Sequence, residues 1–308
     1  MSSITAQDTL RHAPSTDGPS WQESFFLGWC DIQSRSAGSH HISLCPHLQQ
    51  AHVWSWIVTE GVQVSRFQVH TLPLPEDNLD DMRLGPLHFT AGDSPRKLDL
   101  VGALPTAALR LSFEAFTDPV ELSFQTGGLK LGSSHYESMG RVHGTVRLGD
   151  REITVRGSGW HDHSWGPRHF SSNPAGRWLF AVFGDDLAFS AFSLAGPSGA
   201  NEFGYVLDGG VIHPIRTAKF GAGVDDDGIT PTRCDARIRT ESGRGYRLRG
   251  TVVATALTGG MGWLNDSVFF AMDGLTEFEC GGRLGEGFLE VSEVKTPTAA
   301  QRKELGLK

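Results

Sequence analysis

The sequence lacks the features by which membrane, secreted and nucleic-acid-binding proteins are most readily recognised. No window approaches the roughly 18 apolar residues of a membrane-spanning helix, and residues 1–20 are polar where a signal peptide needs an apolar segment. The 27 lysines and arginines form no run and the net charge is −8, so clustered phosphate-binding cations are missing. We therefore expect a soluble, cytoplasmic protein with no membrane span and no nucleic-acid partner.

Cysteine pairs at metal-binding or redox spacing are also missing. The four cysteines, Cys30, Cys45, Cys234 and Cys280, are far apart in the chain, which excludes a zinc knuckle and a thioredoxin-type pair. Buried, reduced thiols are the simplest expectation. Helical patterns are equally scarce, because only Asn78–Met82 and Ala299–Leu305 resemble helices. A doubly wound dinucleotide-binding fold is thereby excluded.

The sequence does contain a long series of short segments that alternate between apolar and polar residues. Val53–Val58 and Val62–Phe67 flank Glu60-Gly61, and this spacing predicts a hairpin. Val142–Leu148 and Glu152–Arg156 flank Gly149-Asp150 in the same way. A dozen or more such segments and 38 glycines predict an all-β fold. We divide the 308 residues into a flexible leader (1–20), two β-barrel domains packed together (21–156 and 157–295) and a tail (296–308).

One stretch, Gly157–Arg168, concentrates acid, base and aromatic side chains between glycines. If residues 160–165 are extended, His161, His163 and Trp165 share one face and Trp160, Asp162 and Ser164 share the other. Histidine titrates near neutral pH and burial raises the pKa of a carboxyl group, so the stretch offers both an acid and a base. It is therefore the first candidate for a catalytic site, expected at the end of a strand near the junction of the two halves.

Two other interpretations of this stretch stay open. In the first, Asp162, Ser164 and Arg168 tie down a corner between sheets while the tryptophans fill the core. In the second, His161 and His163 bind a metal ion from one strand face, with a third ligand drawn from His135, Glu137, His143, His169 or His213. The remaining histidines, including His40 and His41, are interpreted as surface or strand residues.

Three further stretches carry candidate residues. Trp21–Asp31 places Glu23 within an aromatic strand, where a carboxylate must be paired or turned outward. His135–Arg141 holds Tyr136 and Glu137 shortly before the strand that leads into the central motif. A ladder of paired, buried polar groups is the structural alternative for both. Thr258–Asp266, which contains Trp263, predicts a loop over a cavity or a long hairpin connection.

The pattern of Gly157, Gly159, Asp162-His163-Ser164-Trp165-Gly166 and Arg168 resembles the signature of a calycin-like superfamily. Its members include carotenoid 1,2-hydratases (hydroxyneurosporene synthases), AttH-like proteins and many bacterial relatives. Weaker landmarks extend the resemblance over roughly residues 20–292: Trp21–Ser24 with Asp31, His135–Glu137, and Gly285, Gly287 and Glu290. Carotenoid hydratases usually carry Tyr-His-Asp-His-Asn-Trp-Gly where this chain has Trp160–Gly166 with Ser164 and a following Pro167-Arg168, which suggests a sister branch.

The resemblance implies two lipocalin-like β-barrel domains around an apolar cavity and, for the hydratase branch, cofactor-independent addition of water to an isoprenoid double bond. We therefore expect a lyase, hydratase or isomerase that uses no cofactor or metal and acts on an apolar terpenoid or aromatic molecule. The expected catalytic residues are His161, Asp162, His163 and Glu137. The expected substrate-binding residues are Trp160, Trp165, Arg168, Tyr136, Glu23 and Trp263. A homodimer is compatible with these expectations. The alternatives are a non-catalytic carrier of an apolar ligand and a metal-dependent enzyme using His161 and His163.

Overall fold

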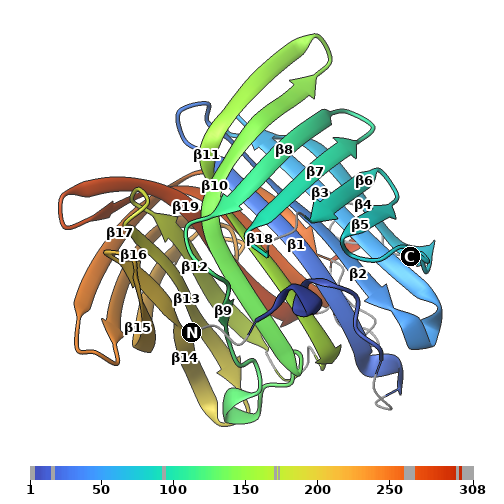
Figure 1. Cartoon of the computed structure of the whole chain (residues 1–308). Coiled ribbons are helices and arrows are strands. Elements are labelled where there is room, and N and C mark those ends of the chain that lie inside the picture. The colour runs from blue at the N-terminus through green and yellow to red at the C-terminus, as the bar shows by residue number, and fades with distance from the viewer. Residues whose placement is uncertain are drawn as a thin grey trace. The chain divides into compact units, whose positions relative to one another are not determined.

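The computed structural model describes residues 4–14, 18–91, 95–169, 172, 174–259, 268–295 and 298–299. This part of the chain forms nineteen strands and four short 3-10 helices, Ala6–Thr9, Gly18–Ser20, Pro46–Leu48 and Thr126–Gly128 (Figure 1). None of the described helices has the length and apolar character needed to cross a membrane. The chain divides into two compact units, one of residues 1–59, 63–125 and 130–168, the other of residues 60–62, 126–129 and 169–308.

The first unit is an antiparallel sheet of eleven strands, in the order β4-β3-β2-β1-β11-β10-β8-β7-β6-β5, with β9 beside β10. The strands are β1 (Trp21–Asp31), β2 (Ser36–Cys45), β3 (Gln50–Thr59), β4 (Val62–Pro73), β5 (Asp81–Leu84), β6 (Leu87–Ala91), β7 (Lys97–Ala103), β8 (Ala108–Ala115), β9 (Val120–Glu121), β10 (Ser134–Leu148) and β11 (Arg151–Pro167).

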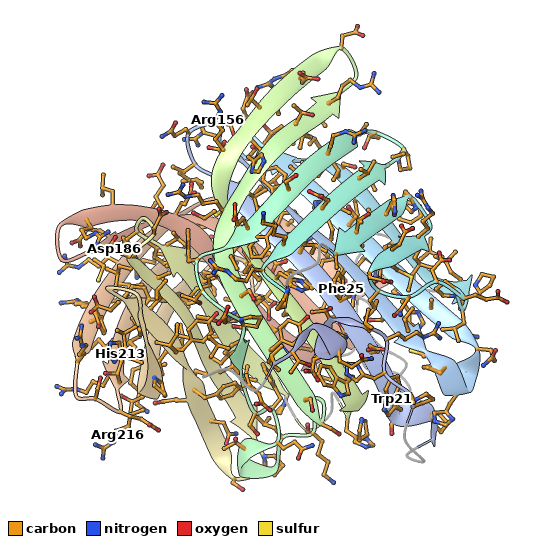
Figure 2. The ribbon with its side chains drawn as sticks, in the orientation of Figure 1. Trp21, Phe25, Arg156, Asp186, His213 and Arg216 are labelled. Atoms are coloured by element: carbon orange, nitrogen blue, oxygen red, sulfur yellow. The ribbon has the colours of Figure 1, made fainter. Side chains whose placement is uncertain are left out.

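One side of this sheet holds a single cluster of buried apolar side chains. The cluster includes Phe25 on β1 and Met82 on β5, and Val64 and Phe67 of β4 pack against it. Since β4 and β5 are the two end strands, the sheet curls and its two ends share one core. Phe25 is labelled on β1 in Figure 2. We call the side that carries this cluster the core face and the opposite side the outer face.

The second unit is a closed antiparallel barrel of eight strands, in which each strand pairs with the next and the last pairs with the first. Its strands are β12 (Ala175–Val182), β13 (Leu187–Gly196), β14 (Gly199–Asp208), β15 (Val211–Val224), β16 (Pro231–Thr240), β17 (Gly245–Gly259), β18 (Val268–Cys280) and β19 (Arg283–Lys295). Its interior is filled by a separate apolar cluster that includes Phe189, Ile238 and Phe278. The predicted all-β fold with two barrel-like units is confirmed, although only the second closes through hydrogen bonds in the described part.

Local sequence explains several of these elements. Glu60 and Gly61 have φ values of 54° and 82°, the two positive values of a type I′ turn, whose twist matches that of the β3–β4 hairpin. The predicted helix at Asn78–Met82 is wrong, because Asp81–Leu84 is a strand in which buried Met82 and Leu84 alternate with exposed neighbours. The predicted helix at Ala299–Leu305 falls almost wholly outside the described residues, as does the part of the 258–266 loop that contains Trp263. The four cysteines are buried, and none forms a disulfide.

The central motif lies in β11, which runs without interruption from Arg151 to Pro167. The whole strand belongs to the first unit, whereas the division at Gly157 expected from sequence assigns the motif to a second domain. Part of the polar N-terminal segment is also in the first unit: Arg11 donates its backbone N–H to Asn78, and His12 donates to Glu23. The sheet and this segment together position the candidate site.

Candidate functional site

The register of β11 with its two neighbours decides which side chains share a face. His161 is opposite Leu27 of β1 and Ser138 of β10, and His163 is opposite Phe25 and Tyr136. Phe25 and Leu27 belong to the core cluster, so both histidines lie on the core face. Asp162, opposite Phe26 and Glu137, lies on the outer face. The predicted alternation of the motif is therefore confirmed.

On the core face, His161 is packed as a neutral imidazole. Its ring lies 4.6 Å from the ring of Phe25 and 6.2 Å from that of Phe113, measured between centroids. Nδ1 donates to the carbonyl of Phe26 at 2.7 Å, which leaves Nε2 as the unprotonated nitrogen. Burial lowers the pKa of His161 to about 3, so this side chain carries no charge near neutral pH.

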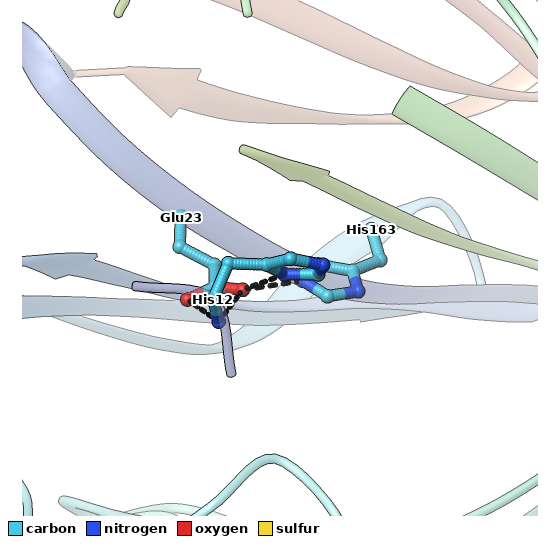
Figure 3. Close-up of side chains that lie close together, drawn as sticks. All are labelled: His12, Glu23 and His163. Atoms are coloured by element: carbon cyan, nitrogen blue, oxygen red, sulfur yellow. Dashed lines mark hydrogen bonds and ion pairs between the residues drawn. The ribbon is translucent and has the colours of Figure 1, made fainter. Parts of the chain in front are cut away.

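The carboxylate of Glu23 contacts two histidines, His163 on β11 and His12 in the N-terminal segment (Figure 3). Its Oε1 lies 2.9 Å from Nε2 of His163 and 2.8 Å from Nδ1 of His12. The backbone N–H of His12 also donates to both carboxylate oxygens, at 3.0 and 3.2 Å. Although burial raises the pKa of Glu23, its close contacts with His12 and His163 outweigh this effect and lower the pKa below its usual value. We call these three residues the His–Glu–His cluster.

Trp165 and Tyr136 complete the core-face group. The Trp165 ring stacks on His12 with a centroid separation of 3.7 Å and an interplanar angle of 10°. Tyr136 is fully buried, and its hydroxyl has no hydrogen-bond partner among the described residues. Its ring lies 5.4 Å from that of His163. Burial raises the pKa of Tyr136 far above its usual value, so the hydroxyl keeps its proton.

On the outer face, Asp162 has the properties of a proton donor. The side chain is partly exposed, and its carboxyl group makes no hydrogen bond to any residue that the structure describes. Burial raises its pKa to about 7, and the charge of Glu137 adds to this effect while His135 and Arg168 oppose it. A carboxyl group with this pKa exchanges protons readily near neutral pH.

A row of aromatic side chains lies on the same face of the sheet as this carboxyl group. Phe26, directly opposite Asp162 on β1, lies 5.7 Å from Trp160 and 5.6 Å from Trp54 between ring centroids. Trp54 in turn stacks on His41 at 4.8 Å and 12°. We call Phe26, His41, Trp54 and Trp160 the aromatic wall. Because a Cβ on Gly28 would lie 2.1 Å from the Trp160 ring, only glycine at this position lets the indole lie against β1.

Polar groups border the aromatic wall. His135 Nε2 lies 3.2 Å from Glu137 Oε1, and burial lowers the pKa of His135 to about 4. The guanidinium of Arg168 donates to the hydroxyl of Ser164 and, at 3.3 Å, to its carbonyl. Burial lowers the pKa of Arg168 to about 10, so it keeps its charge. A neutral imidazole and a guanidinium thus lie near the Asp162 carboxyl group.

The structure divides the predicted site residues between the two faces. Glu23, Tyr136, His161, His163 and Trp165 are on the core face, and Glu137, Trp160, Asp162 and Arg168 are on the outer face. A joint acid–base site of Asp162 with the two imidazoles is not formed, because side chains of adjacent strand residues point to opposite faces.

Sequence reasoning missed His12, Phe26, His41 and Trp54. His12 lies in the segment interpreted as a flexible leader, and no local pattern connects it with Glu23. His41, interpreted from the sequence as a surface or strand residue, lies buried in strand β2. The alternation of His52, Trp54 and Trp56 within β3 is a signal for an aromatic face. Only the sheet order, in which β2 lies between β3 and β1, places this face on the same side as Phe26.

Comparison with known proteins identifies the family. Residues 5–295 match a family described as a domain of unknown function, DUF7064. The chain belongs to this family. A search of curated proteins found no match.

Solved structures share the fold of this DUF7064 member. An AttH-like protein from Nitrosomonas europaea superposes with a TM-score of 0.65 at 15% identity, covering 94% of this chain and 95% of that one. CghA, crystallised with Sch210972, superposes with a TM-score of 0.62 at 11% identity, covering 90% of this chain and 89% of that one. Kievitone hydratase from Nectria haematococca superposes with a TM-score of 0.60 at 12% identity, covering 91% of this chain and 90% of that one. At these identities the likeness shows the fold, and it agrees with the AttH-like and hydratase resemblance of the sequence.

Proposed function

We propose that this protein is a cofactor-independent hydratase, dehydratase or isomerase that acts on an apolar small molecule with a carbon–carbon double bond. The observation that carries the proposal is the position of Asp162. Its carboxyl group has a pKa of about 7, makes no hydrogen bond in the described part of the chain, and lies beside the aromatic wall. The likeness to kievitone hydratase supports this reaction class at the level of fold.

Asp162 supplies the proton in this mechanism. The protonated carboxyl group transfers its proton to one alkene carbon, the π electrons form the new C–H bond, and the other carbon becomes cationic. The faces of Trp160, Phe26 and Trp54 stabilise this cation, because an aromatic ring has a negative face. Water then adds to the cation and returns a proton to the Asp162 carboxylate, so the enzyme is regenerated. The reverse sequence is dehydration, and loss of a different proton gives isomerisation.

The neighbouring polar groups have complementary roles. Arg168 lies close enough to lower the pKa of Asp162, so it stabilises the carboxylate that remains after proton transfer. His135 is neutral and paired with Glu137, which places a second base on the same face to orient water. In this scheme His161 and His163 shape the core behind the site and do not touch the substrate.

Isotope incorporation across a panel of candidate substrates tests the proposal. The purified full-length protein is incubated in H2(18)O and separately in D2O with isoprenoids and prenylated aromatic compounds, and the products are analysed by mass spectrometry. We expect at least one compound to gain labelled water or to exchange deuterium. Asp162→Asn should abolish this activity, whereas Asp81→Asn, which removes an exposed carboxylate, should leave it unchanged. Equal turnover by wild type and Asp162→Asn would refute the assignment.

The aromatic wall also favours one alternative, a carrier that binds an apolar ligand without transforming it. For a carrier, Trp54→Leu should weaken ligand binding while Asp162→Asn leaves both affinity and ligand structure unchanged. Mass spectrometry of small molecules that co-purify with the protein supplies the ligand for this measurement.

A further inference from the structure

The His–Glu–His cluster is a second group of titratable side chains, distinct from the Asp162 site because it lies on the opposite face of β11. Glu23 is 1% exposed and His163 is fully buried, while His12 is partly exposed. Among the described residues, Glu23 forms ion pairs only with these two histidines. A buried carboxylate that meets two imidazoles needs compensation by positive charge.

Hydrogen bonding shows that a positive charge is needed between His163 and Glu23. His163 Nδ1 lies 3.0 Å from the backbone carbonyl of Asp8. A carbonyl can only accept, so Nδ1 must carry a proton. In a neutral imidazole Nε2 then has only a lone pair, yet it faces a carboxylate oxygen at 2.9 Å. Two acceptors at this distance repel each other unless a proton or a metal ion lies between them.

The convergence of two imidazole nitrogens on one carboxylate oxygen favours a metal ion over a single shared proton. A divalent metal ion replaces the proton and also accounts for His12, whose Nδ1 converges on the same carboxylate oxygen. The ligand atoms of all three side chains lie within 4.8 Å of one another.

We propose that Nδ1 of His12, the carboxylate of Glu23 and Nε2 of His163 bind a zinc-class divalent cation. Two imidazoles and one carboxylate are a donor set that zinc uses in tetrahedral sites with a fourth position left for water. Tetrahedral bonds of about 2.0–2.1 Å separate the ligand atoms by about 3.3 Å. The two nitrogens now lie 2.8 and 2.9 Å from Glu23 Oε1, so each nitrogen–oxygen separation would lengthen by about 0.4–0.5 Å. His12 belongs to the N-terminal segment rather than to the sheet, so this adjustment requires no change in a strand.

The surroundings of the cluster are those of a metal site. The hydrogen bond from His163 Nδ1 to the Asp8 carbonyl fixes the tautomer and orients the ring, as the outer partners of metal-bound histidines generally do. Trp165 holds the plane of His12 by stacking. His12 also borders a surface groove of about 380 Å³ that Glu76 and Asp77 line as well. Arg11 also lines this groove, so its two carboxylates outnumber its one guanidinium, and the balance of charge favours the approach of a cation.

Bound metal would act as a clamp between the N-terminal segment and the sheet. Glu23 lies on β1 and His163 on β11, whereas His12 precedes both strands in the chain. The metal therefore joins three separate segments of the first unit. The proposal does not depend on the proposed hydratase activity, because Asp162 and the aromatic wall are on the other face of the sheet.

Metal content and cobalt spectroscopy test the proposal. The full-length protein, stripped with a chelator, is dialysed against Zn²⁺ and analysed by elemental mass spectrometry, and isothermal titration with Zn²⁺ measures the affinity. We expect one zinc per chain and a loss of affinity of roughly 100-fold or more in Glu23→Gln and His163→Ala. Co²⁺ should give the intense visible absorption of a four- or five-coordinate site. The matched control is His88→Ala, which disrupts a partly exposed histidine–aspartate pair (His88 with Asp81) elsewhere on the first unit and should bind zinc like the wild type.

His12→Ala keeps the test decisive if the buried variants fold poorly, since His12 is partly exposed. Circular dichroism should show an unchanged β-sheet spectrum for this variant, with weaker zinc binding and no cobalt absorption. Wild-type protein that retains no zinc, or a His12→Ala variant that binds zinc as tightly as the wild type, would overturn the proposal. In that case the cluster would be a shared-proton pair between Glu23 and His163.

Discussion

Replacing Asp162 by asparagine should stabilise the protein at alkaline pH while removing its activity. The folded-state pKa of Asp162 is raised from 3.8 to about 7. The folded state therefore binds more protons than the unfolded state between these values, and the free energy of unfolding of the wild type falls as pH rises through this range. Asparagine has nearly the same shape and no charge, so the variant lacks this pH-dependent loss.

The pKa shift sets the size of the effect. About 3 pKa units at 1.36 kcal/mol each give an upper limit of about 4 kcal/mol. Asp162 is partly exposed, and screening by solvent reduces this figure to about 1–3 kcal/mol. A side chain that destabilises the folded state by this amount is typical of a residue that is kept because it takes part in the reaction.

Urea unfolding of the full-length protein, followed by tryptophan fluorescence at about pH 4.5 and about pH 8, measures the effect. The stability of Asp162→Asn relative to the wild type should increase from the lower to the higher pH. In Asp81→Asn no such increase is expected, because the hydrogen bond with His88 holds the pKa of Asp81 below its usual value. A stability difference for Asp162→Asn that stays constant or shrinks with rising pH would refute the argument that this carboxyl group is held protonated.

Two further substitutions test the packing around the site. Gly28→Ala places a Cβ 2.1 Å from the Trp160 ring, so it should lower the free energy of unfolding in urea by about 1–3 kcal/mol and lower turnover. Gly245→Ala is the control and should be tolerated, because an added Cβ there meets nothing within 4 Å. An equal effect of both substitutions would contradict the close packing of Trp160. Tyr136→Phe removes a buried hydroxyl that has no hydrogen-bond partner in the described chain, so the free energy of unfolding should be unchanged or rise by up to about 1 kcal/mol. Turnover should also be unchanged. A loss of turnover in this variant would indicate that the reaction takes place on the core face.

Much of the local structure could be predicted from short stretches of sequence. Alternation of apolar and polar residues marks most strands, and the turn at Glu60-Gly61 follows from a glycine between two alternating segments, because glycine adopts positive φ without steric cost. The same period of two placed His161 and His163 on one face and Asp162 on the other. These properties depend only on neighbouring residues in the chain, so they can be predicted before the fold is known. The error at Asn78–Met82 arose because five residues are too few to separate a helical from a strand pattern.

The composition of each face depended on pairings between distant residues. β1 lies beside β11 although more than a hundred residues separate them in the chain. This pairing puts Phe26 opposite Asp162 and brings the Glu23 carboxylate into contact with His163. No local pattern encodes such a partner or its register, since any two alternating strands can pair. The sequence thus identified the chemistry of Gly157–Arg168, and the folded sheet divided it into an acid beside an aromatic wall and a histidine–glutamate cluster on the opposite face.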